Sequence, residues 1–308
     1  MRGLGKALVA AGVVLLVISA IGGTMQWMGG DWWFDEFWPE RVEKTTCYEG
    51  IAQSPNVTLK IPVGSVQIRG CPGDQYNLTI TTIGMGMTQE EARAREEGIH
   101  ITTRTEPDDI KVVAHAGEGE WRNWRGRKVD VLLSIPNATR IKIEGDTASV
   151  RIDELDFQQI TCNLDTAEVR LTSTSFEKGT IETDTGSIHI DGAYRVLRCE
   201  SDTGGIHVGP SPNAQEVDLR ADTGGIWLDV GNSSASYRCE IDTGSIWVSA
   251  PETDGIGYRI DARTDIGSVW MWGSRTKRSL STETPNYAEA PIKIIMELET
   301  DTGSIHVS

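Results

Sequence analysis

The sequence predicts an all-β fold, a single-stranded β-helix (β-solenoid) of about eight to nine coils, preceded by one N-terminal transmembrane helix. Three observations support this prediction. The segment Asp-Thr-Gly-Ser-Ile, or a close variant, returns about every 20 residues in the densest part of the chain. Apolar and polar residues alternate on both sides of each copy, at the period of a half-buried strand. A long uncharged run lies near the N-terminus.

The predicted membrane anchor occupies residues 1–29, together with a short cytoplasmic stub. Residues 7–28 are uncharged and mostly apolar, with Arg2 and Lys6 before them. These features are typical of one membrane-spanning helix with its N-terminus in the cytoplasm and the following chain outside. The alternative is secretion after signal-peptide cleavage at Ala20-Ile21-Gly22. Tryptophans of the kind found at membrane interfaces follow, most of them in a predicted linker over residues 30–45: Trp27, Trp32, Trp33 and Trp38.

The repeat domain is predicted to cover residues 46–308, and its first part, 46–140, is looser than the rest. One short helix is expected over residues 88–98, because Thr88 and Glu91 match a capping box and Gly98 is a stop signal. Strand-like stretches surround this helix: YNLTITTI, GIHITTR, DIKVVAHA and KVDVLLSIP. The repeat itself begins near residue 56 in VTLKIPVGSVQI, whose predicted inward residues are Val57, Leu59, Val66 and Ile68.

The regular part, residues 141–272, has two predicted strands per copy. Residues five and three positions before each Asp are apolar, as are residues four and six positions after it. Stacked copies would share one core at about 4.8 Å per coil. The corner between the strands is predicted to be an Asx-turn closed by the Asp carboxylate. Because Ala148 and Ala167 replace the corner Gly in two copies, small size is expected to matter there more than a positive φ.

The chain leaves the repeat at residues 273–291 and returns in a final coil, 292–308. The intervening segment is predicted to be a surface loop, and it carries Arg275, Lys277 and Arg278. Since a core strand is followed directly by Ser308, the final coil is expected to expose an edge to another subunit. Self-assembly into a surface filament or layer is therefore one alternative function.

Composition argues against several classes of function. The net charge of −16 is spread over the repeats, which disfavours nucleic acid and anionic lipid as partners. Asp-Thr-Gly-Ser is also the signature of aspartic proteases, but those enzymes need two Asp residues that face each other. Here the copies would stack along one wall of the solenoid. We therefore predict that the protein is not an enzyme, with no catalytic residues.

The stacked carboxylates suggest one cofactor. Neighbouring Asp residues at about 4.8 Å repel each other unless backbone donors or a cation compensate. Calcium between coils is one hypothesis, the Asx-turn is the other, and no further cofactor is predicted. The calcium hypothesis concerns four residues: Asp184, Asp202, Asp222 and Asp242.

The fifth residue after each Asp points outward and forms an unusual column. Two interpretations are open: the side chains stack to shield the sheet, or they form a docking stripe for glycan rings, a protein partner or a second copy. Two adjacent histidines could also share a metal ion, but a third ligand is missing from the pattern. The predicted binding column comprises His189, His207, Trp227, Trp247 and Trp270, and the same position holds Arg151, Arg170 and His306.

Cysteines and sequons fit an extracytoplasmic body. Cys47 and Cys71 flank the first repeat and are expected to form a disulfide or to remain two free thiols. The other three cysteines share one inward column two coils apart, so they are expected to be small core residues: Cys162, Cys199 and Cys239. Four sequons allow N-glycosylation: Asn56, Asn77, Asn137 and Asn232.

The motifs VGSVQIRG, DTGSIHI, DTGGIHV and DTGSIWV, behind a single membrane segment, resemble the putative-adhesin or DUF4097 family of β-strand repeat proteins, related to toastrack domains. The resemblance covers residues 45–308. It implies a membrane-anchored β-solenoid of the prokaryotic envelope, linked to adhesion or to envelope-stress signalling. The sequence therefore predicts a non-enzymatic surface protein that binds a protein or glycan of the envelope.

Overall fold

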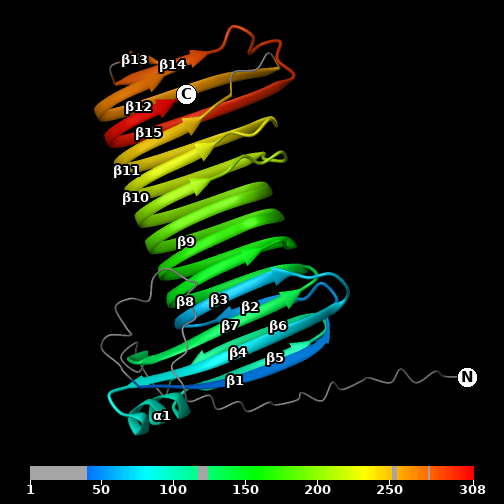
Figure 1. The fold of residues 1–308 in the computed structure, drawn as a ribbon. Coiled ribbons are helices and arrows are strands. Elements are labelled where there is room, and N and C mark those ends of the chain that lie inside the picture. Colours follow the sequence, from blue (N-terminus) through cyan, green and yellow to red (C-terminus); the bar gives the residue numbers. More distant parts are fainter. Residues whose placement is uncertain (1–39, 117–123, 252–254, 277) are drawn as a thin grey trace, which may run out of the picture.

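The protein is an elongated all-β solenoid with one helix at its base, as the computed structural model in Figure 1 shows. The structure describes residues 40–116, 124–251, 255–276 and 278–308. The 15 strands of these residues belong to one sheet, which winds around a single core of buried, mainly aliphatic side chains. The predicted all-β class is confirmed. No helix of the described residues could span a membrane, and the predicted anchor, linker tryptophans and Lys277 lie outside those residues.

The base of the solenoid consists of the looser strands. On one side, β1 (Glu40–Ile51), β4 (Gln75–Gly86) and β7 (Arg127–Ile135) pair antiparallel, and β7 then pairs parallel with β3 (Val63–Gly70). On the other side, β5 (His100–Glu106) pairs with β6 (Asp109–His115), which pairs with β2 (Asn56–Lys60). All the strand-like stretches predicted here are strands. Because β1 begins at Glu40, the predicted linker ends earlier than expected.

The predicted helix forms over α1 (Gln89–Glu97) and packs on β4 and β1. The Thr88 hydroxyl accepts a hydrogen bond from the Glu91 N–H at 3.2 Å, and Gly98 ends the helix. The Glu91 carboxylate accepts from the Met87 N–H at 2.9 Å. The capping box is thus displaced by one residue, and the helix boundaries are as predicted.

The middle of the solenoid stacks its coils in parallel and in register, which confirms the predicted inward columns. These coils are formed by β8 (Ala138–Asp153), β9 (Asp156–Val208), β10 (Glu216–Asp229) and β11 (Ala235–Ser249). Leu219 of β10, for example, lies between Cys199 and Cys239, and all three are buried. β9 runs through several corners without a break, so each corner is a bend in a continuous strand.

The corners differ from the predicted Asx-turns. Within the described residues, the corner carboxylates accept no hydrogen bond from the corner backbone, and Asp184, Asp202, Asp222 and Asp242 are exposed. The corner glycines have φ angles of 148° to 153°, and Gly204 would bring a Cβ within 1.5 Å of the Gly186 carbonyl oxygen. The predicted Asx-turn is therefore wrong. At the corner glycines the bend uses a positive φ and leaves no room for a Cβ, whereas Ala148 and Ala167 form the same corner without a positive φ.

The tip of the solenoid reverses the order of the last two coils. β15 (Ile292–Val307) lies between β11 and β12 (Ile256–Met271), as Figure 1 shows, and it pairs parallel with both. The final coil therefore has no free edge, and the predicted exposed edge is wrong. The predicted surface loop is also partly strand, since β13 (Ser274–Thr276) and β14 (Ser279–Glu283) pair antiparallel with β12.

Candidate functional site

The predicted column lies on the second strand of each coil and forms one unbroken row. The pairing places Trp227 between His207 and Trp247, and His306 between Trp247 and Trp270. His306 belongs to β15, so the coil reversal inserts it between the last two tryptophans. We call the following six residues the aromatic column: His189, His207, Trp227, Trp247, His306 and Trp270.

The rings of the aromatic column stack on one another along the solenoid. Trp227 and Trp247 are nearly parallel, with centroids 4.8 Å apart and an interplanar angle of 6°. His306 lies 6.3 Å from Trp247 and 6.1 Å from Trp270, at angles of 12° and 6°. His189 and His207 continue the row at 5.8 Å with a larger tilt. From Trp227 to Trp270, adjacent ring faces therefore cover each other and the edges remain for solvent or a partner, whereas the His207 ring is tilted by 34° from Trp227.

Two glycines make room for the central indoles. A Cβ on Gly225 would lie 2.6 Å from the Trp227 ring and 3.0 Å from the Trp247 ring, and one on Gly205 would lie 3.1 Å from Trp227. These positions are the second Gly of the Asp-Thr-Gly-Gly copies, where the other copies carry Ser or, in one case, Glu168. Trp227 and Trp247 nevertheless remain 40% and 38% exposed. The choice of Gly over Ser was the sequence signal for ring packing, which the sequence reasoning missed.

Arginines flank the aromatic column at both ends. The Arg275 guanidinium lies 5.5 Å from the centroid of the Trp270 ring, because β13 folds back antiparallel on β12. At the other end, Arg170 forms an ion pair with Glu168 at 2.9 Å, and Arg151 one with Asp153 at 2.6 Å. The contact of Arg275 with Trp270 was not predicted, because the segment that carries Arg275 was predicted to be a surface loop.

Burial and positive neighbours favour the neutral form of the first histidine. Burial lowers the pKa of His189, and Arg170 and His207 lower it further, against a small opposing effect of Glu168. His189 is therefore uncharged at neutral pH. The aromatic column is thus largely apolar on a protein whose net charge is −16.

The Asp ladder, formed by the corner aspartates, does not make a metal site in the part of the chain that the structure describes. No group of three or more His, Cys, Asp or Glu side chains there could hold a metal ion. Burial and the carboxylates of Asp202 and Asp242 raise the pKa of Asp222, and burial with Asp146 and Asp184 does the same for Asp165. Neighbouring carboxylates of the ladder therefore repel one another, as the calcium hypothesis requires. The described residues supply no further ligand for a cation.

The cysteines are all free thiols in this structure. The predicted disulfide between Cys47 and Cys71 does not form, because β4 and β7 lie between β1 and β3. The three inward cysteines are buried, and burial raises the pKa of the Cys162 thiol to about 12. The four sequon residues are exposed, so their glycosylation stays a prediction: Asn56, Asn77, Asn137 and Asn232.

Comparison with solved structures finds similar chains of low identity. A "putative adhesin" from Bacteroides fragilis is 12% identical, with a TM-score of 0.48 over 86% of this chain and 97% of that chain. A "putative adhesin" from Parabacteroides merdae is 8% identical, with a TM-score of 0.43 over 86% and 96%. A "putative lipid binding protein" from Parabacteroides distasonis is 11% identical, with a TM-score of 0.37 over 86% and 96%.

No curated protein matches the sequence. The family model described as Toastrack DUF4097 matches residues 57–307, which include nearly all strands of the solenoid. The match agrees with the resemblance that the repeated Asp-Thr-Gly motifs carry. The chain therefore belongs to the Toastrack DUF4097 family.

Proposed function

We propose that the protein is a non-enzymatic binding protein of the cell envelope, anchored by its N-terminal segment, whose extracytoplasmic solenoid presents the aromatic column to a protein partner. The observation that carries this proposal is the continuous row of rings, of which His207, Trp227 and Trp247 are exposed and the other three half-buried. Single exposed apolar residues are common, but contiguous ones mark interaction sites. Tryptophan is also the residue type most enriched among the side chains that dominate binding energy.

The stack supplies a rigid surface before any partner arrives. Trp227 and Trp247 are each held between neighbouring rings, and Gly225 leaves room for both against the sheet. Ordering a flexible side chain on binding costs about 0.5–1.5 kcal/mol, so a prearranged row binds at a smaller entropic cost. A straight ridge on a long solenoid therefore suits a partner with an extended surface.

Ring geometry favours a protein over a glycan as the partner. Sugars stack on the faces of aromatic rings, but from Trp227 to Trp270 the ring faces cover each other. The Arg275 guanidinium also covers the outer face of Trp270. What remains exposed is a row of apolar ring edges, which suits a groove on a protein.

The test replaces the two central indoles in the full chain, as Trp227→Thr with Trp247→Thr. The matched control is Arg198→Thr with Arg238→Thr, two exposed residues on the other strand of their coils. Saturable binding to isolated envelopes of the producing cell should weaken by about 30-fold or more in the Trp variant, because even one such residue contributes about 2 kcal/mol or more. Equal binding by both variants contradicts the proposal.

Three further arms of the same experiment identify the partner class and the anchor. Protease treatment of the envelopes should abolish binding and glycosidase treatment should leave it, whereas the reverse result indicates a glycan. Concentration-dependent sedimentation of the detergent-solubilised chain would indicate self-association. Full-length protein should stay in the membrane pellet after alkaline carbonate washing, and a variant lacking residues 1–29 should be released.

A further inference from the structure

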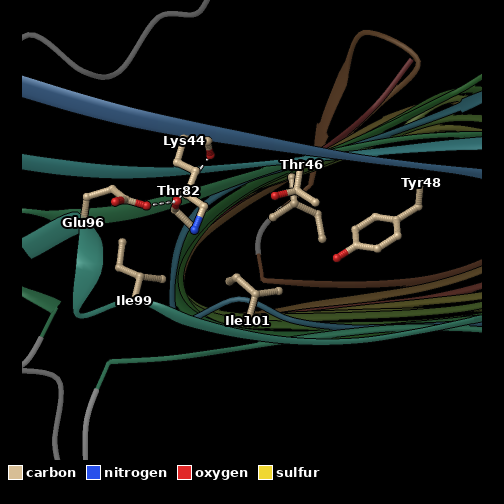
Figure 2. A pocket seen from close by; sticks show the side chains of 8 residues that line it. Lys44, Thr46, Tyr48, Thr82, Glu96, Ile99 and Ile101 are labelled. Atoms are coloured by element: carbon tan, nitrogen blue, oxygen red, sulfur yellow. Dashed lines mark hydrogen bonds between the residues drawn. The ribbon is translucent and has the colours of Figure 1, made fainter. Parts of the chain in front are cut away.

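A second candidate site lies at the base of the solenoid, away from the aromatic column. Figure 2 shows a cavity of about 180 Å³ between β1 and β4 on one side and the start of β5 on the other, beside the end of α1. We call it the base pocket. Most of its wall is polar, and three isoleucines supply the rest. It is lined by Lys44, Thr46, Tyr48, Ile80, Thr82, Glu96, Ile99 and Ile101.

Glu96 places a buried carboxylate in this wall. It lies in the last turn of α1 and is only 8% exposed. Its carboxylate accepts a hydrogen bond from the Thr82 hydroxyl at 2.6 Å, which is its one side-chain hydrogen bond among the described residues. A carboxylate offers about four acceptor sites, and a buried charge is unfavourable unless it is paired. Glu96 therefore has acceptor sites available for a cationic donor inside the pocket.

Lys44 brings a positive charge to the same pocket. It lies on β1 opposite Thr82 of β4, whose hydroxyl is 3.3 Å from the Lys44 carbonyl oxygen. Figure 2 shows the Lys44, Thr82 and Glu96 side chains gathered in one part of the pocket. The ion pairs of the described residues include neither Lys44 nor Glu96. The base pocket thus holds one charge of each sign, and each is available to a ligand.

Hydroxyl groups and isoleucines complete the base pocket. Figure 2 shows the Tyr48 hydroxyl directed toward the other lining side chains. It accepts a hydrogen bond from the Thr103 hydroxyl at 3.1 Å, so its own hydrogen is available to an acceptor in the pocket. Ile80 and Ile99 are buried, and Ile101 packs against the same core. A ligand therefore meets two charges, several hydroxyls and a small apolar surface.

Size and charge together specify the class of ligand. Cavities that bind drug-sized molecules measure about 300–1,000 Å³, whereas a cavity of about 150 Å³ takes one benzene. A simple cation attracted to Glu96 is repelled by Lys44, and a simple anion attracted to Lys44 is repelled by Glu96. A zwitterion avoids both repulsions. A free α-amino acid carries its two charges on one carbon, and an aliphatic side chain leaves an apolar group for the isoleucines.

We propose that the base pocket binds a free α-amino acid with an aliphatic side chain. The ammonium group donates to the Glu96 carboxylate, and the carboxylate of the ligand accepts from the Lys44 ammonium. Both are charge-assisted hydrogen bonds, which are about twice as strong as neutral ones. The aliphatic side chain packs against Ile99 and Ile101. The ligand thereby joins β1, β5 and α1, the elements that surround the pocket.

The test compares amino acids with analogues that lack one charge. The detergent-solubilised full chain, with isoleucine δ1 methyls labelled for NMR, is titrated with L-valine and with L-leucine. At least one should shift the Ile99 and Ile101 methyls saturably, while Ile206 in the middle of the solenoid stays unchanged. The leucine analogues 3-methylbutan-1-amine and 4-methylpentanoate should each bind about 10-fold or more weakly than L-leucine, because each lacks one charge-assisted hydrogen bond.

Two variants assign the charges of the ligand to their partners. Glu96→Gln, which keeps an acceptor for the Thr82 hydroxyl, should weaken the amino acid and the amine by about 10-fold and spare 4-methylpentanoate. Lys44→Met should weaken the amino acid and 4-methylpentanoate and spare the amine. The matched controls are Glu97→Gln and Lys111→Met, at exposed positions of α1 and β6, and they should change no affinity.

Three results overturn the proposal. The first is the absence of a saturable shift with either amino acid. The second is equal affinity for L-leucine and both analogues, which would mean that the apolar group alone binds. The third is unchanged affinity for L-leucine in both Glu96→Gln and Lys44→Met, which would place the ligand elsewhere.

Discussion

The corner glycines are the least replaceable residues of the solenoid. Their φ angles of 148° to 153° lie in a region that only Gly adopts readily. In addition, each of these glycines approaches the carbonyl of the neighbouring coil so closely that a methyl group has no space. The contact repeats along the column, from Gly186 to Gly204 and from Gly204 to Gly224. One side chain at a corner therefore disturbs two coils.

Gly204→Ala should lower the free energy of unfolding by about 3 kcal/mol or more, because it adds a steric clash to backbone strain of about 1–3 kcal/mol. Gly73→Ala is the matched control, since its φ is 100° but nothing lies within 4 Å of the added Cβ. It should cost only about 1 kcal/mol. Urea denaturation followed by circular dichroism measures both. Equal losses would mean that φ strain alone, and not the close approach, sets the cost.

At the scale of elements, β15 is the strand on which the tip depends. It pairs with β11 on one side and β12 on the other, and the pairing partners of β12 are β13, β14 and β15. Coils of a solenoid contact mainly their neighbours, so stability is local. Loss of β15 should therefore release the tip and leave the lower coils folded.

Ile294→Asp tests this dependence by placing an unpaired charge at a fully buried position of β15. Hydrogen exchange should become fast in β12 and β14 and stay slow in β3 and β8, with a local loss of about 3–5 kcal/mol. Glu297→Gln on the exposed face of the same strand should change little. Uniformly faster exchange along the chain would show that the solenoid unfolds as one unit.

The sequence predicts which residues of each strand face the core, but it does not predict the order in which the coils stack. Alternating residues such as Ile188 and Ile190 fix which side of a strand is buried, whatever lies next to it. The alternation does not determine which coils are neighbours, because Ile305 lies opposite Ile246 in one adjacent coil and opposite Val269 in the other. The disulfide prediction failed for a similar reason. Pairs such as Cys47 and Thr79 show that the base strands interleave instead of following the chain.

The aromatic column was predictable as a list of outward residues, but its geometry was not. Parity placed Trp227 and Trp247 on the outer face, and the structure confirms that position. The ring stacking depends on Gly205 and Gly225, and the order of the row depends on His306 in the displaced coil. Neither follows from the local pattern alone.

At the scale of the whole molecule, repulsion between the carboxylates of the Asp ladder lowers the stability of the fold by an amount that depends on pH. The chain has 45 acidic and 29 basic residues, and the ladder sets like charges side by side along one edge. Because burial and neighbouring carboxylates raise the pKa of Asp222, the folded state binds the proton more tightly than the unfolded state does. The ladder therefore reduces stability as pH rises through that raised pKa.

Asp222→Asn should raise the melting temperature at pH 7, and the gain should vanish below about pH 4, where the ladder is protonated in both states. Asp74→Asn, outside the ladder, is the control. Adding 1 M NaCl should shrink the gain, because the Debye length falls to about 3 Å. A gain in melting temperature that persists at low pH would mean that the substitution acts through packing and not through charge.

The position of β15 also bears on how the protein reaches its final form. A chain that emerges from a ribosome or an export channel presents β12 before β15, yet β12 lies outside β15 in the finished solenoid. The tip cannot be completed by adding coils in order of synthesis. Its outermost coil must wait, or first pair with β11 and be displaced, until β15 arrives. Completion of the tip is therefore a step that follows the synthesis of β15.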